Sequence, residues 1–302
     1  MSIRLFAMTT GCLALAACSP GRASRPDTSA GARALAPSPG AGAIVHASPP
    51  EPLVIGDSFT IDSAVLAESR RVNVLVPTVY GEQLPGPMPA LYMLDGGTGE
   101  DFLHIAGLVQ ILVSNGGMRP CVLVGIENTS RRRDMTGPTA VAEDLRIAPV
   151  VGGSAAFRRF IREELMPTIR ARYPTTGEAA IVGESLAGLF VVETFFLERD
   201  LFRGYIAIDP SLWWAGGELV NTAASRLGAS PPAVAAVFLA SSDEPALARL
   251  TAELAAVLES HRSEAFTLHY APMPEESHAT VYHPAALRAF RAMFPPEAEA
   301  PE

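Results

Sequence analysis

Short apolar runs alternate with helical patterns through most of this chain, and this alternation limits its fold more than any other feature. From about Leu53 the runs have the length of buried strands, and the patterns between them are long enough to cover a sheet. We expect strands at 71–76, 91–94, 122–126, 179–182, 205–208, 234–239 and 266–270, and helices at about 101–114, 154–172, 186–199, 245–260 and 284–293. Such alternation predicts an α/β fold, a doubly wound, mostly parallel sheet with helices on both faces.

The N-terminus has the pattern of a bacterial lipoprotein signal. Arg4 precedes an apolar stretch too short to span a bilayer, and the stretch ends in Leu-Ala-Ala-Cys, which resembles the lipobox in which Cys18 carries the lipid. An ordinary secretory signal is the alternative. We therefore expect a signal peptide at 1–17, a lipidated cysteine and flexible Pro/Ala/Gly tether at 18–52, a folded domain at 53–296 and a tail at 297–302.

This signal also predicts where the protein works. A lipid at Cys18 would attach it to the bacterial cell envelope, facing the periplasm, and would be its only link to a membrane. Ser19 directly after the cysteine fits transfer to the outer membrane.

Composition excludes several classes of protein. The formal charge is −9 and becomes −10 once residues 1–17 with Arg4 are removed, and so acidic a chain is a poor ligand for nucleic acid. All 23 basic residues are arginine. Without lysine, the chain lacks the residue needed for P-loop phosphate binding, Schiff-base chemistry and the S-x-x-K serine enzymes. Cys121 lies in an apolar run and is expected in the core.

The stretch IVGESLAGLF places Ser185 between an expected strand and an expected helix. This is the context of a nucleophile elbow, a sharp turn that exposes a serine and needs small neighbours two residues away on each side, here Gly183 and Ala187. A serine that merely caps the helix is the alternative. The pattern favours a catalytic serine.

Partners for such a serine follow later strands. His278 lies in the loop PMPEESHAT, between the last strand and the last helix, and His283 is the second choice. For the acid, the strand at 234–239 leads to Asp243 and Glu244, and Asp209 ends the preceding strand. Hydrolases with this kind of α/β fold carry a Ser, an acid and a His in this chain order, although each could also be an ordinary loop residue.

An oxyanion formed at such a serine needs two N–H donors. The N–H of Leu186, at the start of the helix, is the first candidate. The second should come from the glycine-rich loop after the 91–94 strand, from Gly96 or Gly97, because glycine lets a backbone approach a substrate closely. A simple turn is the alternative.

Two features of the sequence indicate the kind of substrate that the site would bind. Trp213 and Trp214 follow the 205–208 strand and are expected to form an aromatic wall, with burial in the core as the alternative. Arginines 131–133, with Arg133 the chosen contact, follow the 122–126 strand and predict a positive patch for an anionic group, unless they are a solvated face. No metal site is expected, since His278 and His283 are too isolated. A serine nucleophile needs no cofactor, and none is expected.

Five motifs in chain order resemble the putative-esterase family of α/β-hydrolases, which includes esterase D, the enterochelin and salmochelin esterases and the mycolyltransferases. They lie between about residues 72 and 290 and read LYMLDGG, VGIENTSRRRDMTGP, IVGESLAGLF, IDPSLWW and ESHAT. The resemblance implies an α/β-hydrolase fold and a catalytic pair of Ser185 and His278. The family's G-x-x-E acid segment resembles Ser241 to Glu244, which favours Glu244 over Asp243 and Asp209.

The function expected from this resemblance is a serine esterase that works through an acyl-enzyme on a bulky aromatic or siderophore-type ester. An acyltransferase and a carbohydrate (acetyl or feruloyl) esterase would use the same triad. A non-enzymatic envelope binding lipoprotein is the alternative outside catalysis. A small-molecule ester is the expected partner.

The lipobox makes a direct prediction. Changing Cys18 to Ala should move the protein from the membrane fraction to the soluble fraction, because the attachment point of the lipid is lost. Membrane fractionation and detergent partitioning measure this. Unchanged partitioning of the variant would contradict the lipoprotein assignment.

Overall fold

The computed structural model describes residues 48–229, 235–262 and 266–296, and a compact unit begins at Leu53. The expected signal peptide, Cys18, most of the tether, Val234 and the tail at 297–302 lie outside the described residues. None of the helices in the described part combines the length and apolarity that a membrane span needs.

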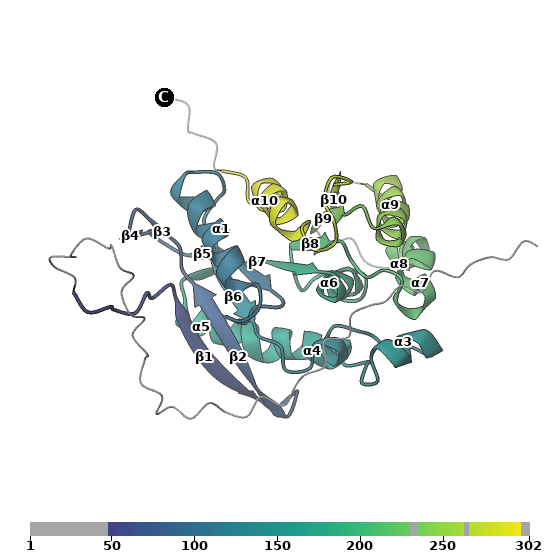
Figure 1. The fold of residues 1–302 in the computed structure, drawn as a ribbon, viewed down its shortest axis with the longest axis horizontal. Coiled ribbons are helices and arrows are strands. Elements are labelled where there is room, and N and C mark those ends of the chain that lie inside the picture. Colours follow the sequence, from purple (N-terminus) through teal and green to yellow (C-terminus); the bar gives the residue numbers. More distant parts are fainter. Residues whose placement is uncertain (1–47, 230–234, 263–265, 297–302) are drawn as a thin grey trace, which may run out of the picture. The chain divides into compact units, whose positions relative to one another are not determined.

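Eight strands form one sheet, in the order β1-β2-β6-β5-β7-β8-β9-β10 (Figure 1). The strands from β6 to β10 run parallel, whereas β2 is antiparallel to both β1 and β6. The predicted doubly wound, mostly parallel sheet is confirmed. Its strands are β1 (Asp57–Ser63), β2 (Glu68–Leu75), β5 (Met88–Met93), β6 (Val122–Ile126), β7 (Thr175–Glu184), β8 (Gly204–Ile208), β9 (Ala235–Ser241) and β10 (Phe266–Pro272), and β3 (Thr78–Val79) pairs with β4 (Glu82–Gln83) as a separate hairpin.

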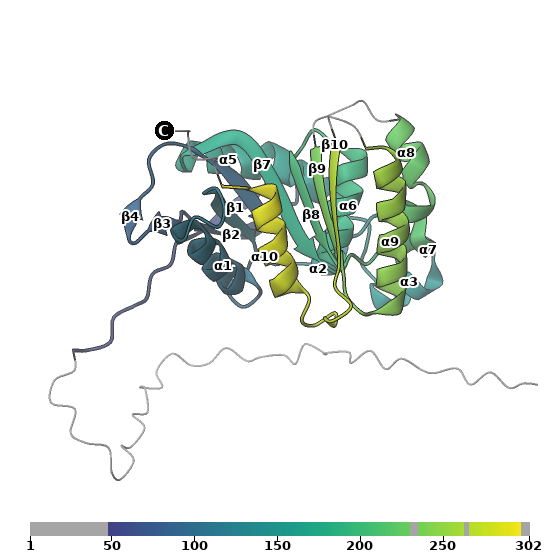
Figure 2. The ribbon, with the colours of Figure 1, turned by 90° about the horizontal axis from the view of Figure 1, so that it is seen from above.

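Helices cover both faces of the sheet (Figures 1 and 2). One face packs against α1 (Phe102–Ser114) and α10 (Tyr282–Met293). The other packs against α4 (Ser154–Phe160), α5 (Met166–Arg172), α6 (Leu186–Leu197), α7 (Trp214–Asn221), α8 (Ala223–Ala229) and α9 (Pro245–Ser260). A π-helical turn, Ile161–Leu165, joins α4 to α5, and the short helices α2 (Arg131–Asp134) and α3 (Ala142–Ile147) follow β6.

Strand residues alternate between the two faces. In β5, Tyr92 belongs to the core under α4–α9, and its neighbours Leu91 and Met93 belong to the core under α1 and α10. All three are at most 2% exposed, which explains why this strand reads as a continuous apolar run. Cys121 is fully buried, as expected, and burial raises the pKa of its thiol to about 12.

A buried ion-pair network fastens the segment after β6 to the sheet. The fully buried Arg70 of β2 donates to Asp134 of α2 at 2.6 Å and also pairs with Glu68. Arg133 contacts both carboxylates, at 2.7 Å to Asp134 and 2.8 Å to Glu68. The guanidinium of Arg70 also lies 5.1 Å from the centre of the Phe157 ring. These contacts fix α2, the helix that carries Arg131.

Replacing Arg70 by Leu should lower the free energy of unfolding by about 3 kcal/mol, because buried Asp134 loses its buried partner. Arg71→Leu is the matched control. That neighbouring side chain is 53% exposed, and its distance of 3.8 Å from the Glu127 carboxylate makes the ion pair a weak one. Its loss should therefore cost less than about 1 kcal/mol. Urea unfolding followed by circular dichroism measures both. Equal effects would contradict a structural role for this network.

Candidate active site

Three strand ends that meet at one edge of the sheet have strained backbones. Asp95 after β5, Ser185 after β7 and Asp209 after β8 have φ values of 53°, 61° and 45°. Such angles are costly for residues other than glycine and cluster at functional sites. β6 and β7 lie on opposite sides of β5, so the chain reverses its direction of winding here, where α/β sheets bind their ligands.

Ser185 is held in a sharp turn between β7 and α6. Its N–H donates to the carbonyl of Ile208 at 3.0 Å, and its own carbonyl accepts the N–H of Ser211 at 3.0 Å. A Cβ on Gly183 would lie 2.7 Å from the Cβ of Ala187, so the turn requires the small residues expected from the sequence. The hydroxyl of Ser185 lies 3.4 Å from that of Ser211, which sequence reasoning did not single out.

His278 and Asp209 form a close pair. Nδ1 of the imidazole lies 2.6 Å from Oδ2 of Asp209, and the carboxylate also accepts bonds from the N–H and hydroxyl of Ser242. Burial disfavours the charge on Asp209, but the bonds from His278 and Ser242 outweigh it and lower the pKa of the carboxyl. Asp209 is therefore ionised at neutral pH and accepts the Nδ1–H proton. The same bond raises the pKa of His278, against its own partial burial.

The structure differs from the sequence expectation at the acid. Glu244, the preferred choice, is the N-cap residue of α9, and Asp243 is exposed. Among the described residues, the carboxylates in contact with His278 are those of Asp209 and Glu184, so the preference for Glu244 is corrected in favour of Asp209. The N–H of Asp243 bonds to the carbonyl of Glu276, which places the end of β9 beside the histidine loop without turning either side chain toward the imidazole.

Glu184, the last residue of β7, was not anticipated from the sequence. Its Oε1 lies 3.4 Å from Nε2 of His278, and its side chain is 17% exposed. Burial raises the pKa of the Glu184 carboxyl to about 7, although His278 and Arg131 act in the opposite direction. Within the described part of the chain, no hydrogen bond joins Ser185 to His278, and Nε2 faces Glu184. The signal available in the sequence was the carboxylate directly before Ser185.

The N–H groups of the two candidate oxyanion donors in the glycine loop have different hydrogen-bond partners. The N–H of Gly96 donates to the carbonyl of Ile126 at 2.9 Å, and a Cβ there would lie 2.2 Å from the Ile126 nitrogen. Gly96 is therefore wrong as a donor, and close packing on β6 explains the glycine. The N–H of Gly97 donates to the exposed carboxylate of Glu100 at 2.8 Å, which an oxyanion would have to replace. Leu186 begins α6, where helical N–H groups lack intrahelical partners.

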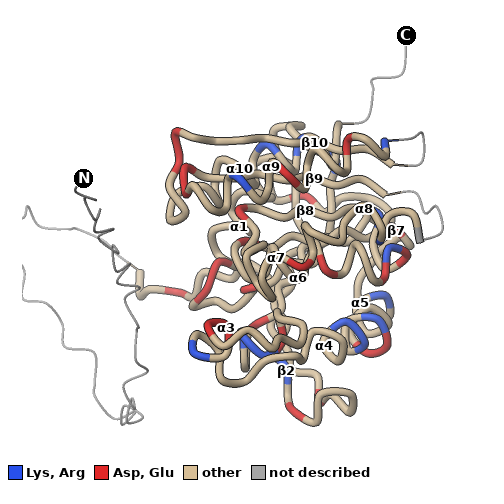
Figure 3. Tube along the Cα trace, turned by 90° about the vertical axis from the view of Figure 1, so that its right-hand side faces the viewer, with Lys and Arg blue, Asp and Glu red and all other residues tan. Residues whose placement is uncertain are grey.

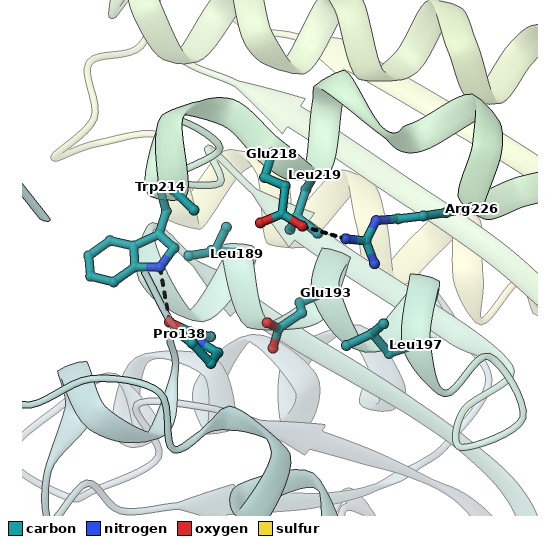
Figure 4. Close-up of a pocket in the computed structure, with 10 residues that line it drawn as sticks. Pro138, Leu189, Glu193, Leu197, Trp214, Glu218, Leu219 and Arg226 are labelled. Atoms are coloured by element: carbon teal, nitrogen blue, oxygen red, sulfur yellow. Dashed lines mark hydrogen bonds and ion pairs between the residues drawn. The ribbon is translucent and has the colours of Figure 1, made fainter. Parts of the chain in front are cut away.

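The two tryptophans occupy different environments. Trp214 is 4% exposed, and its indole N–H donates to the carbonyl of Gly137 at 3.2 Å (Figure 4). It belongs to the core and borders a pocket of about 220 Å³ along α6, so the expected exposed wall is wrong for this residue. Trp213 is half-buried, with its ring centre 5.9 Å from that of Trp214. Its contact with a substrate stays a prediction.

The expected positive patch is largely neutralised. Arg133 pairs with Glu68 and Asp134, and Arg131 forms a two-pronged contact with Asp95 at 2.7 and 2.8 Å. Arginines elsewhere also pair with carboxylates: Arg158 of α4 contacts Glu193, and Arg162 of the π-helical turn contacts Glu198. Figure 3 shows basic and acidic residues close together in this region, around α4 and α5. The charge of Arg133 is therefore balanced within the fold, and its contact with an anionic substrate stays a prediction.

His283, the second choice for the base, has a different partner. Its Nδ1 lies 2.6 Å from Nε2 of His104 on α1, and the two rings stack. Nothing in this contact orients His283 toward Ser185. In the residues that the structure covers, no group of three or more His, Cys, Asp or Glu side chains is arranged to hold a metal ion.

Comparison with known proteins places the chain in a family. The family described as Putative esterase matches residues 63–298. The chain is 33% identical over 164 residues to ferri-bacillibactin esterase BesA of Bacillus subtilis, covering 49% of this chain and 56% of that protein. It is 34% identical over 140 residues to the siderophore triacetylfusarinine C esterase of Aspergillus fumigatus, covering 43% of this chain and 46% of that protein. The matches thus span about half the length of these relatives.

A solved structure covers more of the chain. An IroE-like serine hydrolase from Shewanella oneidensis superposes with a TM-score of 0.72 at 27% identity, over 79% of this chain and 80% of that one. The BES protein from Bacillus cereus has the same TM-score at 20% identity and shares the fold. The chain therefore belongs to the putative-esterase family and has the α/β-hydrolase fold that the sequence predicted.

Replacing Asp209 by Asn should lower the pKa of His278 by about one unit or more, because a charged hydrogen-bond partner of the imidazolium is lost. An NMR titration of the histidine ring protons, assigned with a His278→Gln variant, measures this. Glu244→Gln is the matched control and should leave the titration unchanged. A shift with Glu244→Gln and none with Asp209→Asn would restore Glu244 as the acid.

Proposed function

We propose that this protein is a serine carboxylic ester hydrolase that works through an acyl-enzyme on siderophore-type esters. One observation carries the proposal: a strained Ser185 in a strand–turn–helix junction directly follows Glu184, which contacts a histidine whose Nδ1 is held by a buried, ionised aspartate. Family membership and the names of the relatives support the same class of reaction.

The chemistry follows from these positions. Oγ of Ser185 attacks the ester carbonyl while Nε2 of His278 takes its proton, and Asp209 stabilises the imidazolium that forms. The N–H of Leu186, and that of Gly97 once Glu100 withdraws, stabilise the oxyanion. The imidazolium then protonates the departing alcohol. Water, activated by the same histidine, hydrolyses the acyl-enzyme.

The substrate class rests on the relatives. Two of them are named for the siderophores ferri-bacillibactin and triacetylfusarinine C. We extend the siderophore-type ester to this chain, with half-buried Trp213, close after Asp209, as the aromatic contact. Arg133 takes no part in this proposal, because its guanidinium forms ion pairs with Glu68 and Asp134. The lipid anchor at Cys18 and a location in the cell envelope belong to the same proposal and rest on the N-terminal pattern.

Ser185→Ala and His278→Ala should each lower the turnover of a siderophore ester by about 10³-fold or more, because the two residues act as one unit. His283→Ala is the matched control, since that ring contacts His104, and it should retain most of the activity. Chromatography of the released acid and alcohol measures turnover. Full activity of Ser185→Ala would refute the proposal, and loss with His283→Ala but not His278→Ala would identify a different base.

A further inference from the structure

His278 lies between two carboxylates from neighbouring strands. Asp209, at the end of β8, contacts Nδ1 at 2.6 Å, and Glu184, at the end of β7, lies 3.4 Å from Nε2. The Asp209 contact is that of an orienting acid. Glu184 faces the other nitrogen, the one that must exchange a proton with Ser185, and the mechanism above gives it no role.

The surroundings of Glu184 make its charge effective. Its side chain is largely buried, so its field on the imidazole is weakly screened. The charged and titratable groups around it come from every neighbouring element: His278 after β10, Arg131 on α2, Asp209 after β8, Asp95 after β5 and Tyr282 on α10. Arg131 is already engaged by Asp95 in a two-pronged ion pair. Among these groups, the Nε2 side of His278 is the cationic contact that the Glu184 carboxylate makes directly.

We propose that Glu184 is a positioning residue for the esterase reaction, whose carboxylate holds the Nε2 side of His278 and stabilises the imidazolium that forms when Ser185 gives up its proton. This inference rests on the proposed function. The proton passes from Oγ of Ser185 to Nε2 and then to the leaving alcohol, as the bond from Oγ to the carbonyl carbon forms and the ester C–O bond breaks. Glu184 does not take up the transferred proton and acts only by attraction and orientation.

The role has a signature in the pH dependence. His278 must be neutral to accept the proton, so an anion that raises its pKa moves the acidic limb of kcat/KM to higher pH. The same anion stabilises the imidazolium that forms in the reaction, so it also raises the plateau of kcat/KM above that limb. At low pH the Glu184 carboxyl is protonated, because its pKa is about 7, and it then resembles a glutamine amide. A purely structural residue would instead change the rate at every pH.

The test is the pH profile of kcat/KM for the full chain and its Glu184→Gln variant on one siderophore ester. The variant should show an acidic limb about one unit lower, a plateau about tenfold lower, and a rate that converges with the wild type at low pH. Glu275→Gln is the matched control. It removes a charge from an exposed residue three positions before His278 and should leave the profile unchanged.

Two results would overturn the inference: superimposable profiles, or a loss in Glu184→Gln that is the same at every pH. An NMR titration of His278 gives a second readout that needs no turnover, and its pKa should fall by about one unit in Glu184→Gln. Ser185→Ala in the same assay separates the two claims. If Ser185→Ala is inactive while Glu184→Gln matches the wild type, only the role of Glu184 fails; if Ser185→Ala is active, the proposed function fails with it.

Discussion

The left-handed backbone at Ser185 is the constraint on which the site depends. A residue with a side chain pays about 1–3 kcal/mol for such an angle, so neighbouring structure must hold it in place. Here β8 and the segment after it do so, through Ile208 at the end of the strand, which accepts the serine N–H, and through Ser211, which donates to the serine carbonyl. The strand that holds the nucleophile therefore also delivers Asp209, one residue after Ile208. One strand end sets both the exposure of the serine and the place of the acid.

Much of this fold could be predicted from the sequence, because parallel strands buried on both faces are short continuous apolar runs. The strand at 122–126 has the predicted bounds, and the helix at 245–260 does too. β1 was missed because its alternating pattern is weak: it is an edge strand with mostly exposed residues. The nucleophile was predictable for a local reason, since a sharp turn leaves a mark within five residues, in Gly183 and Ala187.

The acid was not predictable in the same way. Asp209 and Glu244 both follow strands of the sheet, and the choice between them depends on how the loop after β10 folds back over the strand ends. The same limit applies to Gly96 and Arg133, whose partners Ile126 and Glu68 are distant in sequence. Glycines and arginines in a loop signal a site, but only packing shows whether their N–H groups and charges are already used. Glu184 escaped notice because its role depends on a histidine 94 residues further along.

The central claim is that Ser185 is the nucleophile, and covalent labelling tests it most directly. A fluorophosphonate probe reacts with a serine whose hydroxyl is activated by a neighbouring base. After labelling of the full chain, peptide mass spectrometry should find the phosphonate on the peptide that contains Ser185, with no labelling in Ser185→Ala and much slower labelling in His278→Ala. An adduct on another residue, or equal labelling of the wild type and Ser185→Ala, would contradict the account.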